Sequence, residues 1–214
     1  MDRLPRGRHG LSPEFVARNQ RERLIAGLIQ ALYEVGYQKT TVSRIGQRAA
    51  VSKSDFYKHF ESKDECFAAA YDAAIERIRE QVADACEAAE GEEWAHRVRS
   101  GIAALLKLFS AEPALASIVL VEGLRAGRGV YDRYQAAVDS FVGLLREGAP
   151  PPLDGSEAPE TTDEAVVGGI ASLLGRRVFA GEAEQLSELF PELLEFALAA
   201  YLGAEEARRI VSSG

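Results

Sequence analysis

The stretch that most constrains this sequence is residues 40–63, which hold two short helical patterns separated by a tight turn. Thr41 is a favourable N-terminal cap, and apolar residues recur at helical spacing over residues 42–49, which predicts a first helix of about two turns. Ala50 and Val51 fill the turn. Two short helices joined in this way are typical of a helix-turn-helix, a motif that binds DNA.

The second helix of this stretch begins at Ser52. Asp55 follows three residues later and completes a capping box, which predicts a helix over Lys53–Phe60. Phe56 and Phe60 share one face of that helix, and we expect them to anchor it to a core. The side chains expected to face outward are those of Lys53, Ser54, Tyr57 and Lys58.

A further capping box, formed by Ser62 and Glu65, predicts the start of the next helix and places Lys63 in its first turn. A cation at that position opposes the helix dipole at a cost of a few tenths of a kcal/mol, so it needs compensation from outside. A DNA phosphate would supply it.

Residues 18–71 resemble the DNA-binding domain of the tetracycline-repressor (TetR) family of bacterial transcription regulators. The resemblance is carried by Gly36-Tyr37 at the end of a long first helix, by TTVSRIGQRAAVSKSDFYKHFESKDECF, and above all by the FYKHF run with Ser62-Lys63 after it. It implies phosphate contacts from Thr41, Tyr57 and Lys63. It implies base or backbone contacts from Arg44, Ser52, Lys53 and His59. The remainder of the chain resembles the family only as an all-helical pattern of suitable length.

Two residues depart from the family pattern. Ala50 stands where glycine is frequent, and an alanine in the left-handed conformation costs about 1 kcal/mol. Asp55 stands where a small or hydroxyl residue is usual, which removes an expected phosphate contact. Asp55 either accepts a hydrogen bond from cytosine N4 or caps its own helix, and its spacing from Ser52 favours the cap.

The charge of the chain is unevenly divided. Residues 1–60 carry 11 Lys and Arg against 5 Asp and Glu, whereas residues 61–214 carry 14 against 28. This division predicts a DNA-binding module joined to one that does not touch DNA. Cys66 and Cys86 fall about 30 Å apart on one predicted helix and cannot pair. Cys66 is either a redox sensor or, as we favour, a small buried hydrophobe. No signal peptide or membrane span is evident, so we expect a reduced, cytoplasmic protein.

The predicted domains are a disordered basic arm (1–13), a helix-turn-helix DNA-binding domain (14–62) and a helical ligand-binding and dimerisation domain (63–214). The arm is either a plain tail or a source of extra DNA contacts through its three arginines. Proline-rich residues 148–163 are expected to form an exposed linker. Helices are expected over 14–35, closed by Gly36, and over 63–89, 92–110, 114–127, 130–146, 164–180 and one more stretch after Gly181.

The second domain offers candidates for a ligand site. Glu122 lies on an apolar face, where it either pairs with Arg125, sits at an exposed helix end, or contacts a ligand inside a cavity. Tyr134 brings a hydroxyl into an apolar stripe. Since the candidates are mostly apolar, we expect a hydrophobic or amphipathic small molecule. The predicted pocket residues are Phe109, Glu122, Arg125, Tyr134 and Phe141.

The last two long helices carry more apolar surface than a terminal hairpin can bury alone. Two such hairpins would bury it as an intermolecular four-helix bundle, and the TetR resemblance implies the same arrangement. The predicted dimerisation residues are Ile170, Leu174, Leu186, Leu193, Leu194 and Ala197.

The sequence contains no constellation typical of an enzyme, a metal site or a cofactor site. Its three histidines are scattered, and no phosphate-binding loop or nucleophile motif is present. We therefore expect an all-α homodimer that represses transcription and is released by a small-molecule effector from a palindromic operator in double-stranded DNA. Two alternatives remain: a small-molecule-binding or enzymatic helical protein with a vestigial helix-turn-helix, and a constitutive DNA-architectural protein without ligand. The salt dependence of DNA binding separates a working DNA-binding dimer from a vestige.

Overall fold

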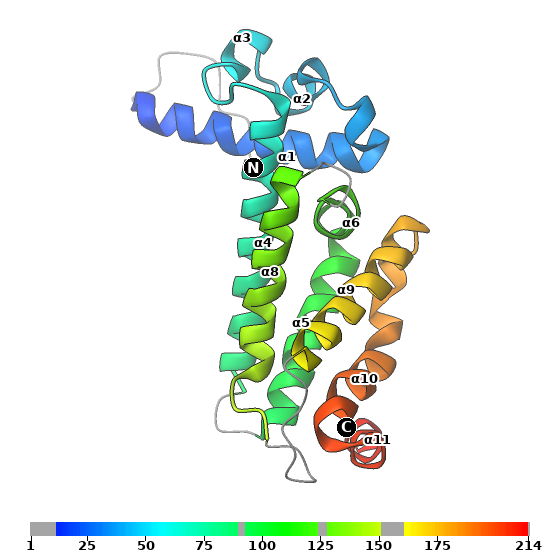
Figure 1. The fold of residues 1–214 in the computed structure, drawn as a ribbon. Coiled ribbons are helices and arrows are strands. Elements are labelled where there is room, and N and C mark those ends of the chain that lie inside the picture. Colours follow the sequence, from blue (N-terminus) through cyan, green and yellow to red (C-terminus); the bar gives the residue numbers. More distant parts are fainter. Residues whose placement is uncertain (1–11, 90–92, 124–127, 151–160, 214) are drawn as a thin grey trace. The chain divides into compact units, whose positions relative to one another are not determined.

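The computed structural model describes residues 12–89, 93–123, 128–150 and 161–213. Within these ranges the protein is all helical and has no strand, as the sequence predicts. The chain divides into two compact units, Met1–Ala73 and Ala74–Gly214, and the division falls inside helix α4 (Figure 1). The predicted domain boundary, between residues 62 and 63, lies at the start of that helix. Three predicted features fall outside the described residues: the arm up to residue 11, Arg125, and the linker over 151–160.

The N-terminal unit contains α1 (Pro13–Lys39), α2 (Val42–Ala49), α3 (Lys53–Phe56) and the first turns of α4 (Lys63–Glu87) (Figure 1). Gly36 interrupts α1 with φ 73° and ψ 168°, a conformation that glycine adopts without strain. The helix predicted to end at Gly36 therefore does break there, and one more turn follows. Gly27 lets α1 and α2 approach closely, because a Cβ at that position would lie 3.0 Å from backbone atoms of Ile45 and Ala49.

The core of this unit joins α1, α2, the segment after α3, and α4. Its fully or almost fully buried side chains are those of Leu24, Leu28, Leu32, Ile45, Phe56, Phe60, Cys66, Phe67 and Tyr71. Phe56 and Phe60 are 0% and 2% exposed, so they anchor the region as predicted. Burial of Cys66 raises the pKa of its thiol to about 12, which agrees with an inert hydrophobe rather than a redox sensor.

The second helix of the motif is shorter than predicted. The α-helical pattern expected to reach Phe60 ends at Phe56, because Tyr57 has ψ −4° and the next two N–H groups bond to carbonyls three residues back. Lys58 donates to Asp55 and His59 to Phe56, at 3.1 and 3.0 Å. This 3-10-like tightening keeps Phe56 and Phe60 on the buried side while the chain turns toward α4.

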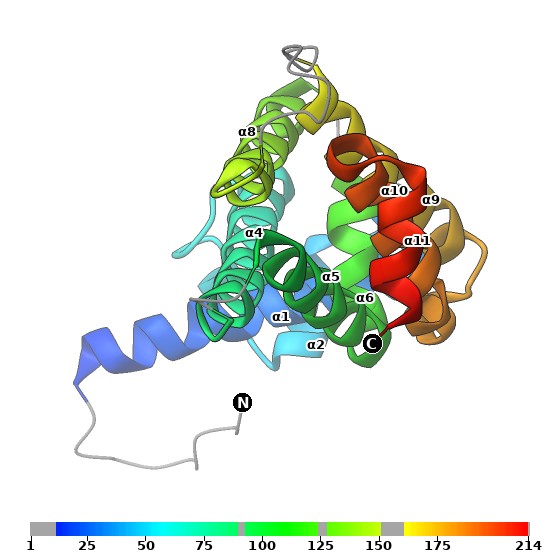
Figure 2. The same cartoon turned by 90° about the horizontal axis from the view of Figure 1, so that it is seen from below.

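The C-terminal unit contains the rest of α4 and the helical segments α5 (Trp94–Ala111), α6 (Pro113–Ser117), η1 (Ile118–Glu122), α8 (Arg128–Arg146), α9 (Thr162–Phe179), η2 (Ala183–Leu189), α10 (Phe190–Leu202) and α11 (Ala204–Ser212). Figure 2 looks along several of these helices and shows α5 between α4 on one side and α10 and α11 on the other. Among the described residues no single helix is long and apolar enough to cross a membrane, and α5 with Pro113–Glu122 meets that composition only as a pair bent by 107°.

Two predicted helices of this unit are divided in the structure. The apolar helix expected over 114–127 begins as α6, with Pro113 in its first turn, and then widens into the π-helical turn η1. The helix expected after Gly181 is a 3-10 segment, η2, followed by α10, which starts with Pro191 in its first turn and ends at Gly203. The apolar period runs through both junctions and therefore gave no sign of them in the sequence.

Two polar contacts tie distant segments of this unit together. Asp163, at the start of α9, is 8% exposed and accepts hydrogen bonds from Tyr201 Oη of α10 and from Arg146 Nε of α8, the latter at 2.6 Å. Arg77 of α4 pairs through both terminal nitrogens with Glu112, the residue between α5 and α6, and Arg77 Nη1 lies 2.6 Å from Glu112 Oε2. Paired in this way, the charges fix the ends of α8, α9 and α10 and the corner between α5 and α6.

The predicted dimerisation residues are mostly buried inside one chain. Leu174, Leu186, Leu193, Leu194 and Ala197 are between 0% and 3% exposed and form part of the unit's core, and Ile170 is half-buried. Within the single chain the first five side chains are therefore core residues, and dimerisation through them stays a prediction. The extra apolar surface is covered within the chain by α5, because η2 and α10 pack against it.

We predict that Ala50→Gly stabilises the N-terminal unit. Ala50 is the one non-glycine residue with positive φ among the described residues (φ 50°, ψ 45°), and glycine relieves a cost of about 1 kcal/mol. Thermal unfolding followed by circular dichroism should show a higher midpoint. The matched control is Ala26→Gly, in the exposed face of α1, which should lower the midpoint since glycine costs about 1 kcal/mol inside a helix. A lower midpoint for Ala50→Gly would contradict the prediction.

Candidate nucleic-acid interface

The start of α2 is held by its own cap. Thr41 Oγ1 accepts a hydrogen bond from the Arg44 N–H at 3.2 Å, as its position in the sequence predicts. Thr41 and Arg44 are both exposed, so the first turn of α2 presents a hydroxyl and a guanidinium to solvent. The other end of α2 is capped from α1: Arg23 donates to the carbonyls of Ala49 and Ala50, the latter at 2.9 Å. Sequence analysis missed this role of Arg23, which no local pattern signals.

The recognition segment, residues 52–60, presents its polar side chains on one exposed surface. Lys53, Ser54 and Lys58 are exposed, and Tyr57 is 50% exposed with its ring edge-on to that of Phe56 at a centroid distance of 5.4 Å. The buried Phe56 thus fixes the direction in which the neighbouring Tyr57 hydroxyl points. The surface carries hydroxyl and ammonium donors, which are the groups that contact DNA phosphates and base edges.

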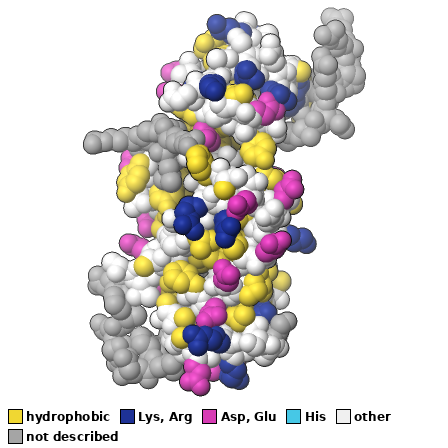
Figure 3. All heavy atoms as spheres, turned by 90° about the vertical axis from the view of Figure 1, so that its right-hand side faces the viewer, with side chains coloured by type: hydrophobic (Ala, Val, Ile, Leu, Met, Phe, Trp, Pro, Cys, Tyr) yellow, Lys and Arg dark blue, Asp and Glu magenta, His cyan; other side chains and the backbone are white. Residues whose placement is uncertain are grey.

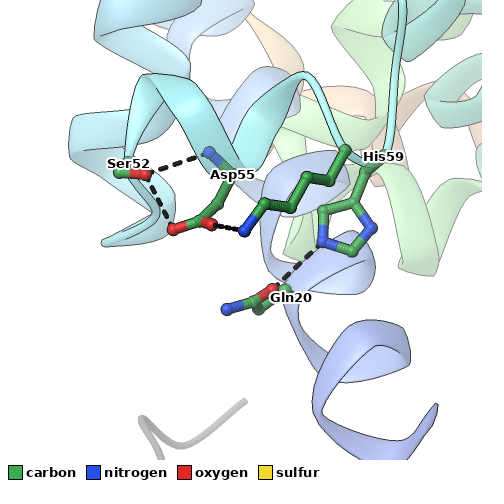
Figure 4. Close-up of polar contacts among 5 residues, drawn as sticks. Gln20, Ser52, Asp55 and His59 are labelled. Carbon is green, nitrogen blue, oxygen red and sulfur yellow. Dashed lines mark hydrogen bonds and ion pairs between the residues drawn. The ribbon is translucent and has the colours of Figure 1, made fainter. Parts of the chain in front are cut away.

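Asp55 links the beginning and the middle of this segment (Figure 4). Ser52 Oγ accepts the Asp55 N–H at 3.0 Å and donates its own hydroxyl to Asp55 Oδ2 at 2.7 Å. Lys58 Nζ donates to Asp55 Oδ1 at 2.7 Å. The hydrogen bonds from Lys58 and Ser52 lower the pKa of the Asp55 carboxyl, so it is ionised at neutral pH. The structure thus has Asp55 as part of a helix cap, the role that its spacing favours.

His59 is directed back toward α1. Its Nε2 lies 3.1 Å from Gln20 Oε1, so the ring is half-buried against the first helix (Figure 4). Burial, and next the positive charge of Arg21, lower the pKa of His59, which favours the neutral ring. The resemblance implies a DNA contact from His59, whereas here the side chain positions the recognition segment on α1.

Lys63 also has a partner within the chain. Its Nζ donates to the Tyr37 carbonyl at 3.0 Å and lies 3.9 Å from the centroid of the Tyr37 ring, while the Tyr37 hydroxyl bonds to Asp64. The compensation that we expected from a phosphate is thus supplied by Tyr37, at the break in α1. Sequence analysis missed this contact because 26 residues separate the two side chains.

The predicted DNA-binding residues therefore fall into two groups. Seven of them lie on exposed surfaces of α2 and the recognition segment: Thr41, Arg44, Ser52, Lys53, Ser54, Tyr57 and Lys58. His59 and Lys63 are half-buried and bonded to α1 and to the turn that follows Gly36.

The predicted ligand residues come from three segments of the C-terminal unit. Phe109 of α5 and Glu122 of η1 are buried, at 2% and 4% exposure. Tyr134 and Phe141 of α8 are half-buried, and desolvation raises the pKa of the Tyr134 hydroxyl. The apolar stripe predicted for this helix consists of Tyr131, Tyr134, Val138, Phe141, Val142 and Leu145. Tyr131 is 54% exposed and the other five are half-buried, so α8 is packed less closely than expected.

An all-helical chain with a helix-turn-helix of exposed hydroxyl and basic side chains belongs to the class of DNA-binding transcription regulators. Residues 24–70 match the family model described as bacterial regulatory proteins, tetR family. The N-terminal unit therefore contains a DNA-binding domain of the tetR family.

Solved structures of several such regulators resemble the whole chain. The fatty acid degradation regulator FadR from Bacillus halodurans has a TM-score of 0.72 at 16% identity, over 89% of this chain and 97% of that one. FadR from Bacillus subtilis, in complex with stearoyl-CoA, has a TM-score of 0.68 at 16% identity, over 85% and 98%. SmeT, the repressor of the Stenotrophomonas maltophilia multidrug efflux pump SmeDEF, has a TM-score of 0.66 at 18% identity, over 86% and 92%.

The position of His59 predicts a pH dependence of stability. Since its pKa is lower in the folded chain than its ordinary value of 6.5, the unfolded chain binds the proton first as the pH falls. The stability of the N-terminal unit should therefore drop as the pH is lowered from about 7, and level off below the folded pKa. Denaturant unfolding at a series of pH values measures this.

Two variants test the assignment to His59. His59→Gln should flatten this part of the pH profile. Gln20→Glu places a carboxylate beside the ring, raises the pKa of His59 and should reverse the slope. If Gln20→Glu kept the wild-type slope, another group would be responsible for it.

Proposed function

We propose that this protein is a ligand-responsive transcriptional repressor that binds a palindromic operator as a homodimer. The observation that carries the proposal is the exposed surface formed by Lys53, Ser54 and Tyr57, held in place by two buried phenylalanines in a domain of the tetR family. Side chains of this kind on a helix-turn-helix enter the major groove, and two copies bind half-sites about 34–36 Å apart. We propose no enzymatic activity.

We assign phosphate contacts to Thr41 and Tyr57, and base or backbone contacts to Arg44, Ser52, Lys53 and Ser54. His59 and Lys63 act by positioning the recognition segment and the start of α4, because their polar atoms are bonded inside the chain. Lys58 is paired with the Asp55 carboxylate and receives no DNA contact in this assignment.

We assign dimerisation to the outer face of α9 and α10. Phe196 of α10 is 48% exposed and lies over Gly169 of α9, whose Cβ would be 3.2 Å from the ring. Figure 3 views this side of the C-terminal unit, where apolar patches alternate with charged side chains. The neighbouring surface residues are small, namely Ala165, Gly168, Ser172, Ala199 and Ala200. A face of this composition allows close packing of helices. We therefore propose the same intermolecular four-helix bundle, with these surface residues at its interface in place of the buried leucines.

The proposed effector is a small hydrophobic or amphipathic molecule bound in the C-terminal unit. Two features of this unit support the site: the half-buried Tyr134 and Phe141 on α8, and the π-helical turn η1 with the buried Glu122, because π-helical turns are frequent at functional sites. The similar fold of a FadR bound to stearoyl-CoA makes long-chain acyl compounds the first candidates. The ligand would shift the dimer between arrangements that differ in operator affinity, and α4 is the covalent path between the two units.

DNA binding tests the proposal directly. The purified protein is titrated against the DNA upstream of its own coding region and against scrambled DNA, across a range of salt concentrations. We expect saturable binding to a palindrome by at least two chains, with a steep salt dependence. Binding without sequence preference would favour an architectural protein, and no binding at low salt would favour a vestigial motif.

Tyr57→Phe should weaken binding to operator and scrambled DNA by the same factor, roughly tenfold for the dimer, because a phosphate contact carries no sequence information. Lys53→Gln should instead change the ratio between operators that differ in base sequence. The matched control is Tyr33→Phe, in α1, which is 49% exposed and has no proposed DNA contact. Unchanged operator affinity for Tyr57→Phe would remove Tyr57 from the interface.

Phe196→Glu should convert the dimer to monomer, because it places a charge at the centre of the proposed face. Sedimentation equilibrium measures the change, and operator affinity should fall with it. Tyr131→Glu, on the exposed side of α8, serves as the control and should leave the dimer intact. A dimer that survives Phe196→Glu would place the interface elsewhere.

A further inference from the structure

We propose that Asp55 limits the affinity of this protein for DNA of any sequence, by holding Lys58 in an ion pair and keeping it from the phosphate backbone. The inference rests on the proposed DNA-binding function and adds a residue that works against it. It differs from both roles considered for Asp55 on sequence grounds, a reader of cytosine and a helix cap alone.

The geometry gives Asp55 two separate tasks (Figure 4). One carboxylate oxygen, Oδ2, accepts the Ser52 hydroxyl at 2.7 Å and belongs to the cap. The other, Oδ1, lies 2.7 Å from Lys58 Nζ, one turn further along the segment. The cap requires only the first contact, so the pairing with Lys58 is an addition that the cap does not explain.

The pair lies on the surface that faces DNA in the proposed complex. The Lys58 side chain is 69% exposed and that of Asp55 33% exposed, and both neighbour the exposed Lys53, Ser54 and Tyr57. This surface of the recognition segment carries two ammonium groups and one carboxylate. Asp55 therefore removes half of its positive charge.

The pair is weak in water but matters beside DNA. An exposed ion pair contributes little to folding, so Lys58 is not locked in place. However, a phosphate that approaches Lys58 also approaches the Asp55 carboxylate within a few ångströms, and the repulsion opposes the attraction. Lys58 therefore releases few counterions when DNA binds, although its position and exposure suit a phosphate contact.

A lower sequence-independent affinity suits a ligand-responsive repressor. Phosphate contacts strengthen binding to operator and to other DNA alike. A ligand can dissociate the operator complex only to the extent that it binds one arrangement of the dimer more tightly than the other. With one phosphate contact fewer per chain, the affinity for the operator stays low enough for such a ligand to dissociate the complex.

The test measures the salt dependence of binding to operator and to scrambled DNA for four proteins: wild type, Asp55→Asn, Lys58→Met and the double variant. Asparagine keeps an oxygen for the Ser52 hydroxyl and so keeps the cap. We expect Asp55→Asn to strengthen binding to both DNAs by the same factor, roughly threefold to tenfold per chain, and to steepen the slope of log K against log salt by up to about 0.9 per chain. The double variant should return to the wild-type slope.

Glu61→Gln is the matched control for net charge, because Glu61 is exposed at the end of the same segment and has no ion pair in the described structure. It should change the slope much less than Asp55→Asn does. Thermal unfolding of each variant checks that the N-terminal unit stays folded.

Three results would overturn the inference. Weaker binding of Asp55→Asn to the operator alone would make Asp55 a base reader. Unchanged slopes, with only a lower unfolding midpoint, would leave it a cap. A steepened slope that persists in the double variant would show that Lys58 is not the group released. If wild type binds DNA and the slopes coincide, this inference alone fails; if no variant binds any DNA, the proposed function fails with it.

Discussion

The burial of Phe56 and Phe60 is the contact on which the DNA-binding surface depends. A helix of four residues has no stability of its own, since helix nucleation is unfavourable and α3 forms hardly one turn. Each buried phenylalanine contributes about 1.5–3 kcal/mol, which is enough to hold the segment against the core of α1, α2 and α4. Because the two rings point inward, Tyr57 and Lys58 between them point outward, while His59 lies against α1. The direction of Tyr57 is thus a consequence of core packing.

Several polar groups near this surface serve the protein's own structure. Arg23 caps α2, Lys63 binds the carbonyl and ring of Tyr37, and His59 bonds to Gln20. These contacts fix the ends of α2, the recognition segment and α4 before DNA arrives, which lowers the entropic cost of ordering them in a complex. The groups proposed to contact DNA are exposed and make at most local capping bonds, whereas Lys58 is paired with the Asp55 carboxylate. Whether a basic residue here positions the segment or binds DNA depends on whether its polar atom is hydrogen-bonded to another helix of the same chain.

In the C-terminal unit the spacing of apolar residues predicted the helices well, but it did not predict which surfaces cover their apolar faces. A stripe of leucines indicates that one face is buried, yet it is the same whether the covering surface belongs to this chain or to another. Leu186, Leu193 and Leu194 are covered by the chain itself, whereas Phe179 of α9 and Phe196 of α10 are 67% and 48% exposed. Likewise the period continues through η1 and η2, since π- and 3-10 turns change the backbone hydrogen bonds without changing the residue types.

The sequence by itself determined the all-helical class, the helix-turn-helix with its Thr41 and Ser52 caps, the break at Gly36 and the buried pair Phe56 and Phe60. These features depend on neighbours within four residues, and local spacing records them. Only the tertiary structure decided that Arg23, Lys63 and His59 are engaged inside the chain, that Asp163 joins α8 to α9 and α10, and that the predicted dimer leucines are core. The polar contacts among these outcomes join groups from 17 to 39 residues apart, and no local pattern carries that information.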